Sequence, residues 1–211
     1  MEARSSANSR SRVQTASRAW GSIVAGYSSG AVGLVAFLAT NGASGIPAPA
    51  AIGAACLIAI GLVLPAAGML QLSRGVDSTQ RDVRYGFGMQ AFGLLGLLSG
   101  VVLVVGVSSL SGYLVGAVLV GTASVSAIVG AFLLRTLYKS AIASSSGGAA
   151  CLISGTVLTF SGVGLIVGSD IAFEYWISTV ENAIFVDLGA TASACGCVLA
   201  AYSFFVLHNR G

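Results

Sequence analysis

The pattern G-x-S-x-G stands at residues 26–30 and is the first place in this chain where chemistry can be sought. In α/β-hydrolases this pattern holds a nucleophilic serine on a sharp turn between a strand and a helix. Here Ser28 lies inside a long apolar run, where we expect a continuous helix. A serine nucleophile also needs a base, and the only histidine, His208, follows the last apolar run. We therefore predict no catalytic residue and no enzyme activity.

The cysteines suggest a second kind of chemistry, metal binding or thiol exchange. All four fall within apolar runs, at Cys56, Cys151, Cys195 and Cys197, and no C-x-x-C pair occurs. Because they are two residues apart, Cys195 and Cys197 point roughly 200° away from each other on a helix. We expect the four to be small packing residues. We predict no metal site and no cofactor.

The composition indicates a membrane protein. Of the 211 residues, 55% are hydrophobic and 8% are charged, whereas about 25% are charged in an average soluble protein. A helix of about 20 apolar residues crosses the hydrocarbon core of a bilayer. Six runs reach that length, at residues 20–40, 50–70, 88–109, 113–137, 149–170 and 183–207.

These runs predict an all-α, polytopic integral membrane protein with six transmembrane helices arranged as three hairpins. The short break between the third and fourth runs predicts a tight turn. The expected domains are a polar, Arg- and Ser-rich tail at residues 1–19, a transmembrane domain at 20–207 and a short tail at 208–211.

The charged residues predict the orientation of the chain. With six spans, all ten Lys and Arg residues fall on the side of the two termini, and the other side carries Asp170, Glu174, Glu181 and Asp187. Basic residues mark the cytosolic side of membrane proteins, so we expect both tails to be cytosolic. The net charge of +3 then signals topology, and we expect no nucleic-acid partner. The expected location is the cell (plasma) membrane, with an organellar membrane as the alternative.

Glycines four residues apart recur along the predicted spans. Such a pair lies on one helix face and lets a neighbouring backbone approach closely within the bilayer. The stretch at 99–106 matches that at 161–168 in six of eight positions, which suggests related hairpins. We expect these faces to pack the chain into a homo-oligomer or a larger membrane complex. The predicted packing residues are Gly26, Gly30, Gly96, Gly100, Gly112, Gly116, Gly164 and Gly168, with Gly189, Ser193 and Cys197 in the last span.

Ionisable residues within a membrane usually mark the path of a transported solute. The middle of every predicted span lacks one, and Asp187, near the outer end of the last span, comes nearest. With Glu181 and Glu174 it is a candidate for an outer vestibule. Gln90 is expected at the membrane interface, near the end of its run. A structural or accessory role is therefore our main hypothesis, and a channel or carrier for a small neutral solute or weak acid is the alternative.

Two stretches connect the chain to known families. The residues AIGLVLPAAGMLQLSRG at 59–75 and YGFGMQAFGLLGLLSGVVLVVG at 85–106 resemble the HdeD-type six-span small membrane proteins. That resemblance implies three small-residue hairpins with cytosolic ends, in a family that is linked to acid stress and has no settled biochemical activity. Parts of both stretches, at 67–75 and 85–93, also resemble the acetate/succinate uptake transporters, which are six-span hexamers. The Asn-Pro-Ala-Pro-Leu-Gly motif of those transporters is missing here, so no substrate residue carries over.

Overall fold

The structure is a computed structural model that describes residues 2–41, 48–76, 79–107, 110–141, 146–175 and 178–209. Within these ranges the chain forms helices and no strand. The six helices are α1 (Glu2–Asn41), α2 (Ala48–Gly75), α3 (Arg81–Gly106), α4 (Leu110–Ala141), α5 (Ser146–Tyr175) and α6 (Thr179–His208). Each contains a stretch that is long and apolar enough to cross a membrane. The predicted fold class, an all-α protein with six such helices, is confirmed.

The six helices form a closed ring. The most extensive contacts join α1 to α2, α3 to α4 and α5 to α6, as expected for three hairpins of antiparallel neighbours. Further contacts between α2 and α3, between α4 and α5, and between α6 and α1 complete the ring. Contacts across the ring are few: α3 touches α5 slightly, and aromatic and polar side chains of α1 reach α3. Side chains that point inward from α1, α3, α5 and α6 therefore share one core.

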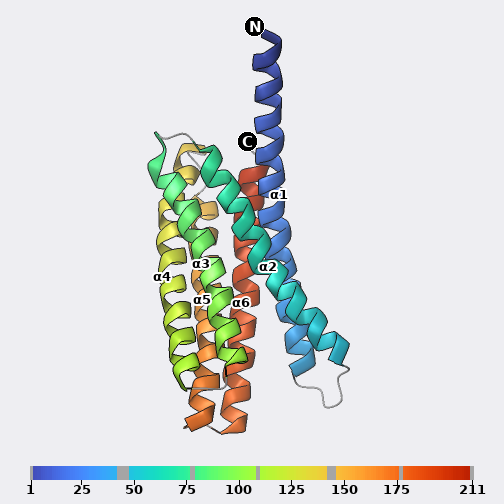
Figure 1. Cartoon of the computed structure of the whole chain (residues 1–211), viewed down its shortest axis with the longest axis vertical. Helices are drawn as coiled ribbons and strands as arrows, with labels where there is room; N and C mark the ends of the chain where they lie inside the picture. The colour runs from blue at the N-terminus through green and yellow to red at the C-terminus, as the bar shows by residue number, and fades with distance from the viewer. Residues whose placement is uncertain are drawn as a thin grey trace.

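The two ends of the bundle differ in shape. Both chain termini lie at the same end, and α1 extends beyond the other helices there (Figure 1). This extension belongs to the predicted tail at residues 1–19, whose backbone is helical from Glu2 onward. At the opposite end the α1–α2 hairpin leans away from the other four helices (Figure 1). The ring is therefore held together mainly in its terminal and middle parts.

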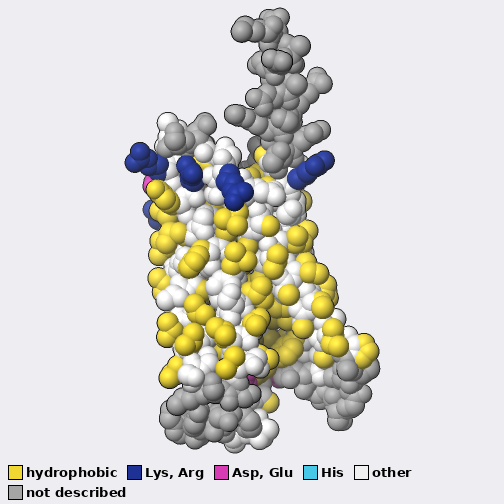
Figure 2. Space-filling view, viewed as in Figure 1, with side chains coloured by type: hydrophobic (Ala, Val, Ile, Leu, Met, Phe, Trp, Pro, Cys, Tyr) yellow, Lys and Arg dark blue, Asp and Glu magenta, His cyan; other side chains and the backbone are white. Residues whose placement is uncertain are grey.

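Arginines mark the terminal end of the bundle. Figure 2 shows Lys and Arg side chains at one level near that end, above a surface that is mostly apolar. The arginines whose side chains are described there are all exposed: Arg18, Arg74, Arg81, Arg84 and Arg135. We call these five residues the basic belt. A belt of this kind lies at the boundary between hydrocarbon and headgroups, because charged side chains are costly deeper in a bilayer. That this end faces the cytosol stays a prediction.

Candidate functional site

Aromatic side chains fill the ring near the basic belt. The Trp20 ring lies 5.9 Å from the ring of Phe87 and 5.9 Å from that of Phe204, centroid to centroid. Seven residues further along α1, the Tyr27 ring stacks on the ring of Phe204, with 6.0 Å between the ring centroids. These contacts join α1 to α3 and α6. Tyr27, Phe87 and Phe204 are almost completely buried, so they close this part of the ring interior.

Gln90 is the most polar residue in the core. Its side chain is 0% exposed. Its Nε2 donates to the carbonyl oxygen of Ala127 at 3.0 Å and to Thr156 Oγ1 at 3.2 Å. The Tyr27 hydroxyl donates to Gln90 Oε1 at 3.5 Å, a long contact. Thr156 in turn donates to the Leu152 carbonyl at 2.8 Å. One amide therefore links α3 to α1, α4 and α5.

The expectation that Gln90 lies at the interface is wrong. The helix α3 begins at Arg81 and not at residue 88, so Gln90 lies about 14 Å along the helix from its start. A signal was present in the sequence, because Gln90 shares one helical face with Phe87 and Leu94, which are also buried. A buried amide is costly in hydrocarbon unless its groups are hydrogen-bonded, and the bonds to Ala127 and Thr156 satisfy that requirement.

A second set of buried hydroxyls joins α4, α5 and α6. The Tyr138 hydroxyl is hydrogen-bonded to Ser203 Oγ, and Ser203 donates to the Gly148 carbonyl at 2.9 Å. Further along the α5–α6 hairpin, Ser193 donates to the Thr159 carbonyl at 3.0 Å. Ser193 was predicted as a packing residue, but the hydrogen bonds themselves could not be predicted, because single Ser and Thr residues in an apolar run have no distinctive spacing. Their donors are used within the bundle.

Six of the eight predicted packing glycines lie against a neighbouring segment. A Cβ atom added at Gly26 would overlap the ring of Pro65 on α2, and one added at Gly30 would lie 3.3 Å from the Cα of Gly61. The α3–α4 hairpin brings Gly100 and Gly116 together, since a Cβ on either would lie 2.9 Å from the carbonyl oxygen of the other. At Gly96, an added Cβ would lie 3.0 Å from the Cβ of Ala123. At Gly112, it would lie 2.7 Å from the Cβ of Val107.

Gly164 and Gly168 are different, because they do not pack against another helix of the same chain; their predicted role in packing between chains stays a prediction. A Cβ atom at either position would meet no atom within 4 Å. The reason is the rotation of α5, which turns another row toward α6. A Cβ at Gly155 would lie 2.7 Å from the Gly196 carbonyl oxygen, and one at Gly162 would overlap Gly189 and Ser193. Gly189 and Ser193 in the last span therefore do pack closely. Cys197 is buried beside Thr159, while Cys195 is exposed.

Gly164 and Gly168 instead line an open groove between α4 and α5. Gly121 on α4 also has no atom within 4 Å of an added Cβ and lies in the same groove. The groove has a volume of about 320 Å³, and the buried ring of Phe160 contributes to it. We call it the α4–α5 groove. Its lining residues are Ala117, Val120, Gly121, Ser124, Ile128, Phe160, Ser161, Gly164, Val167, Gly168 and Ile171.

Of the three candidate vestibule residues, Glu181 and Asp187 have described side chains, and both lie on α6. Glu181 is exposed and belongs to a capping box at the start of α6, where its carboxylate accepts from the Ser178 backbone N–H and hydroxyl at 2.9 Å each. Asp187 is exposed on α6, six residues further on, which is about 9 Å along the helix axis. The side chain of Glu174 lies outside the described residues. Among the described residues, no group of three His, Cys, Asp or Glu side chains could hold a metal ion.

Comparison with known proteins finds no matching family model, no similar curated protein and no similar solved structure. The class of the protein therefore follows from its own helices. It is an integral membrane protein with six helices that can each cross a bilayer. The resemblances to the HdeD-type proteins and to the acetate/succinate uptake transporters stay predictions.

Proposed function

We propose that this protein is a structural or accessory subunit of the membrane that associates with further copies of itself through the α4–α5 groove. The observation that carries the proposal is the open position of Gly121, Gly164 and Gly168 in that groove. In lipid, helices associate through small residues that let backbones approach, because apolar side chains gain little from leaving apolar lipid. A groove with three uncovered glycines is suited to such an approach.

A second copy of the chain is the occupant we favour. The same kind of contact already joins the helices inside each hairpin, as at Gly30 with Gly61 and at Gly100 with Gly116. The groove also presents Ser124 and Ser161, whose hydroxyls can form hydrogen bonds across a helix–helix interface. The bilayer is the other expected partner. We further propose that the protein has no enzyme activity, that it uses no cofactor and that it is located in the cell membrane.

The mass of the purified protein in lipid nanodiscs or mild detergent tests this proposal. Native mass spectrometry should give a multiple of the 21.0 kDa chain. The variant Gly164→Leu should be monomeric, because the new side chain fills the groove without a clash inside the chain. Gly53→Leu is the matched control, since that position is also open but lies on α2. A monomeric wild type, or an oligomer that Gly164→Leu leaves intact, would contradict the proposal.

The alternative function is a channel or carrier for a small neutral solute or weak acid, and Gln90 is the observation that favours it. Its amide and the Thr156 and Tyr27 hydroxyls form a polar cluster inside the ring, where a solute with hydrogen-bonding groups could bind. Two observations oppose a transport function. These polar groups form hydrogen bonds to one another, and the Tyr27 ring stacks on Phe204, so the ring interior is filled there.

Flux of urea, glycerol and acetate into liposomes separates the two functions. The structural proposal predicts no flux above that of empty liposomes. Flux that the wild type supports and that Gln90→Leu abolishes would favour transport. Asp187→Asn provides a comparison at the other end of the bundle.

A further inference from the structure

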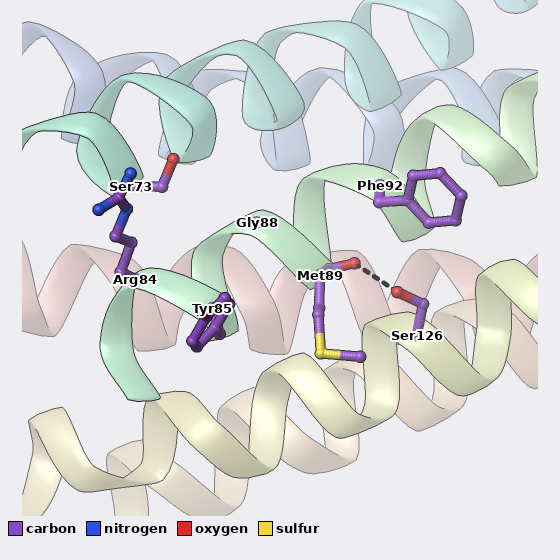
Figure 3. A pocket seen from close by; sticks show the side chains of 7 residues that line it. All are labelled: Ser73, Arg84, Tyr85, Gly88, Met89, Phe92 and Ser126. Carbon is purple, nitrogen blue, oxygen red and sulfur yellow. Dashed lines mark hydrogen bonds between the residues drawn. The ribbon is translucent and has the colours of Figure 1, made fainter. Parts of the chain in front are cut away.

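A second groove opens at the level of the basic belt, between α2, α3 and α4. It has a volume of about 340 Å³ and is lined by Ser73, Arg84, Tyr85, Gly88, Met89, Phe92 and Ser126 (Figure 3). We call it the α3 groove, because five of these seven residues lie on that helix. It is open to the side of the bundle, where lipid surrounds a membrane protein. It shares no lining residue with the α4–α5 groove.

The polar end of the α3 groove holds one cation. The Arg84 side chain extends from α3 toward Ser73 on α2 (Figure 3). Arg84 is exposed, and within the described ranges no carboxylate forms an ion pair with it. The Ser73 hydroxyl donates to the Leu70 carbonyl at 2.8 Å, so it is a polar neighbour rather than a counter-charge. A guanidinium in this setting is suited to a phosphate, which it can bind through two parallel hydrogen bonds.

The rest of the α3 groove is apolar and shaped by one glycine. Gly88 has no atom within 4 Å of an added Cβ, and it lies between the exposed rings of Tyr85 (63% exposed) and Phe92 (65% exposed). These three residues share one helix face, since their spacing is three and four. Ser126 on α4 donates to the Met89 carbonyl at 3.0 Å and so fixes the neighbouring wall (Figure 3).

The direction of the groove matches that of a lipid. From Arg84 to Phe92 the helix advances by eight residues, about 12 Å, away from the basic belt and into the apolar part of the surface. A phospholipid has the same order of groups, with its phosphate at the membrane surface and its chains below. Arg84 is the one basic residue that lines the groove, and a single basic residue at the membrane surface raises the affinity for an anionic headgroup about fivefold.

We propose that the α3 groove binds one anionic phospholipid, with its phosphate on Arg84 and one acyl chain over Gly88 between Tyr85 and Phe92. Because the acyl chain of the lipid is surrounded by hydrocarbon whether the lipid is bound or free, this acyl chain contributes little to the preference among lipids. The charge of the headgroup decides that preference, and the chain fixes the lipid in place.

Native mass spectrometry of the full chain in detergent tests this proposal, with phosphatidylglycerol as the anionic probe and phosphatidylcholine as the zwitterionic one. Wild type should retain phosphatidylglycerol in preference by about fivefold. Arg84→Gln should remove that preference. Arg81→Gln, the matched control, should keep it, because Arg81 is also exposed but lines a different cavity. Equal losses in both variants would show a general attraction of charge and overturn the proposal.

Two further arms test the acyl chain and the source of the phosphate. Gly88→Leu should weaken phosphatidylglycerol retention, because a side chain there fills the floor of the groove without a clash in the chain. Gly21→Leu, equally open but on α1, should not. If Gly88→Leu retains phosphatidylglycerol as well as wild type does, the proposed position of the acyl chain is overturned. If Arg84→Gln does not fold, the Gly88→Leu result alone decides whether the proposal stands. Competition by glycerol 3-phosphate at equal concentration would identify a site for free phosphate esters and also overturn it.

Discussion

Gln90 Nε2 on α3 lies 3.2 Å from Thr156 Oγ1 on α5, and this hydrogen bond joins two helices that otherwise barely touch. A ring of six helices held only by its neighbours could open at any one contact. The bond across the ring opposes such opening, because separating α3 from α5 would leave an amide proton unsatisfied inside the bundle. The Gln90 amide therefore acts as a cross-link within the core.

Replacing Gln90 by Leu should destabilise the protein modestly. The change removes the bonds to Ala127 and Thr156 and takes the acceptor away from the Tyr27 hydroxyl. We expect the free energy of unfolding to fall by about 1 to 2 kcal/mol, since hydrogen bonds between membrane helices are individually weak. Unfolding by SDS in mixed micelles measures the change. Gln71→Leu is the control, because Gln71 is exposed on α2, and an equal loss there would refute the cross-link.

Gly26→Leu should separate α1 from α2. The added side chain would run into the ring and backbone nitrogen of Pro65, which cannot turn away as a flexible side chain can. Overpacking of this kind costs about 1 to 3 kcal/mol of unfolding free energy, and a backbone contact places this site at the upper end. Gly21→Leu on the same helix should cost little, since its Cβ would meet open space. Similar unfolding curves for the two variants would show that the close approach of Gly26 to Pro65 does not matter.

The spans and their pairing could be predicted because the bilayer fixes them. A hydrocarbon core of set thickness demands runs of about 20 apolar residues, and short connections make consecutive helices antiparallel neighbours. The charge asymmetry predicted a bundle end rich in basic residues, and Figure 2 shows Lys and Arg side chains gathered near one end. These features depend on the composition and length of whole segments, so they do not depend on the identity of any single residue.

Which face of each helix packs against its neighbour could not be predicted with the same success. The helix α5 carries two glycine rows, one with Gly155 and Gly162 and one with Gly164 and Gly168, and spacing alone does not say which of them meets α6. The decisive signal lies in the partner, because Gly155, Thr159 and Gly162 have the same spacing, four residues and then three, as Gly189, Ser193 and Gly196. Matching two helices at once would have identified the row that packs.

Two neighbouring glycines on α5 should therefore respond differently to the same substitution. Gly162→Leu would place a side chain against Gly189 and Ser193, so we expect the α5–α6 hairpin to loosen and the unfolding free energy to fall by about 1 to 3 kcal/mol. Gly164→Leu should leave the unfolding free energy of the monomer within about 0.5 kcal/mol of wild type. SDS unfolding at a protein concentration low enough to keep each variant monomeric compares the two. If Gly164→Leu were the more damaging, the assignment of the two rows would be reversed.

The start of α6 offers a local test that does not depend on global unfolding. Ser178 Oγ accepts from the Glu181 backbone N–H at 3.3 Å, and the Glu181 carboxylate accepts from the Ser178 backbone N–H at 2.9 Å. Such a capping box satisfies N–H groups that have no partner within the helix. Ser178→Ala removes the side-chain acceptor, which typically costs about 1 kcal/mol. Hydrogen exchange at the Glu181 amide should then quicken by about fivefold, the rate equivalent of that free energy. Thr179→Ala changes a hydroxyl one residue further on, and it should leave the exchange of this amide unchanged. If both variants quickened exchange alike, the first turn of α6 would owe its order to something other than the Ser178 cap.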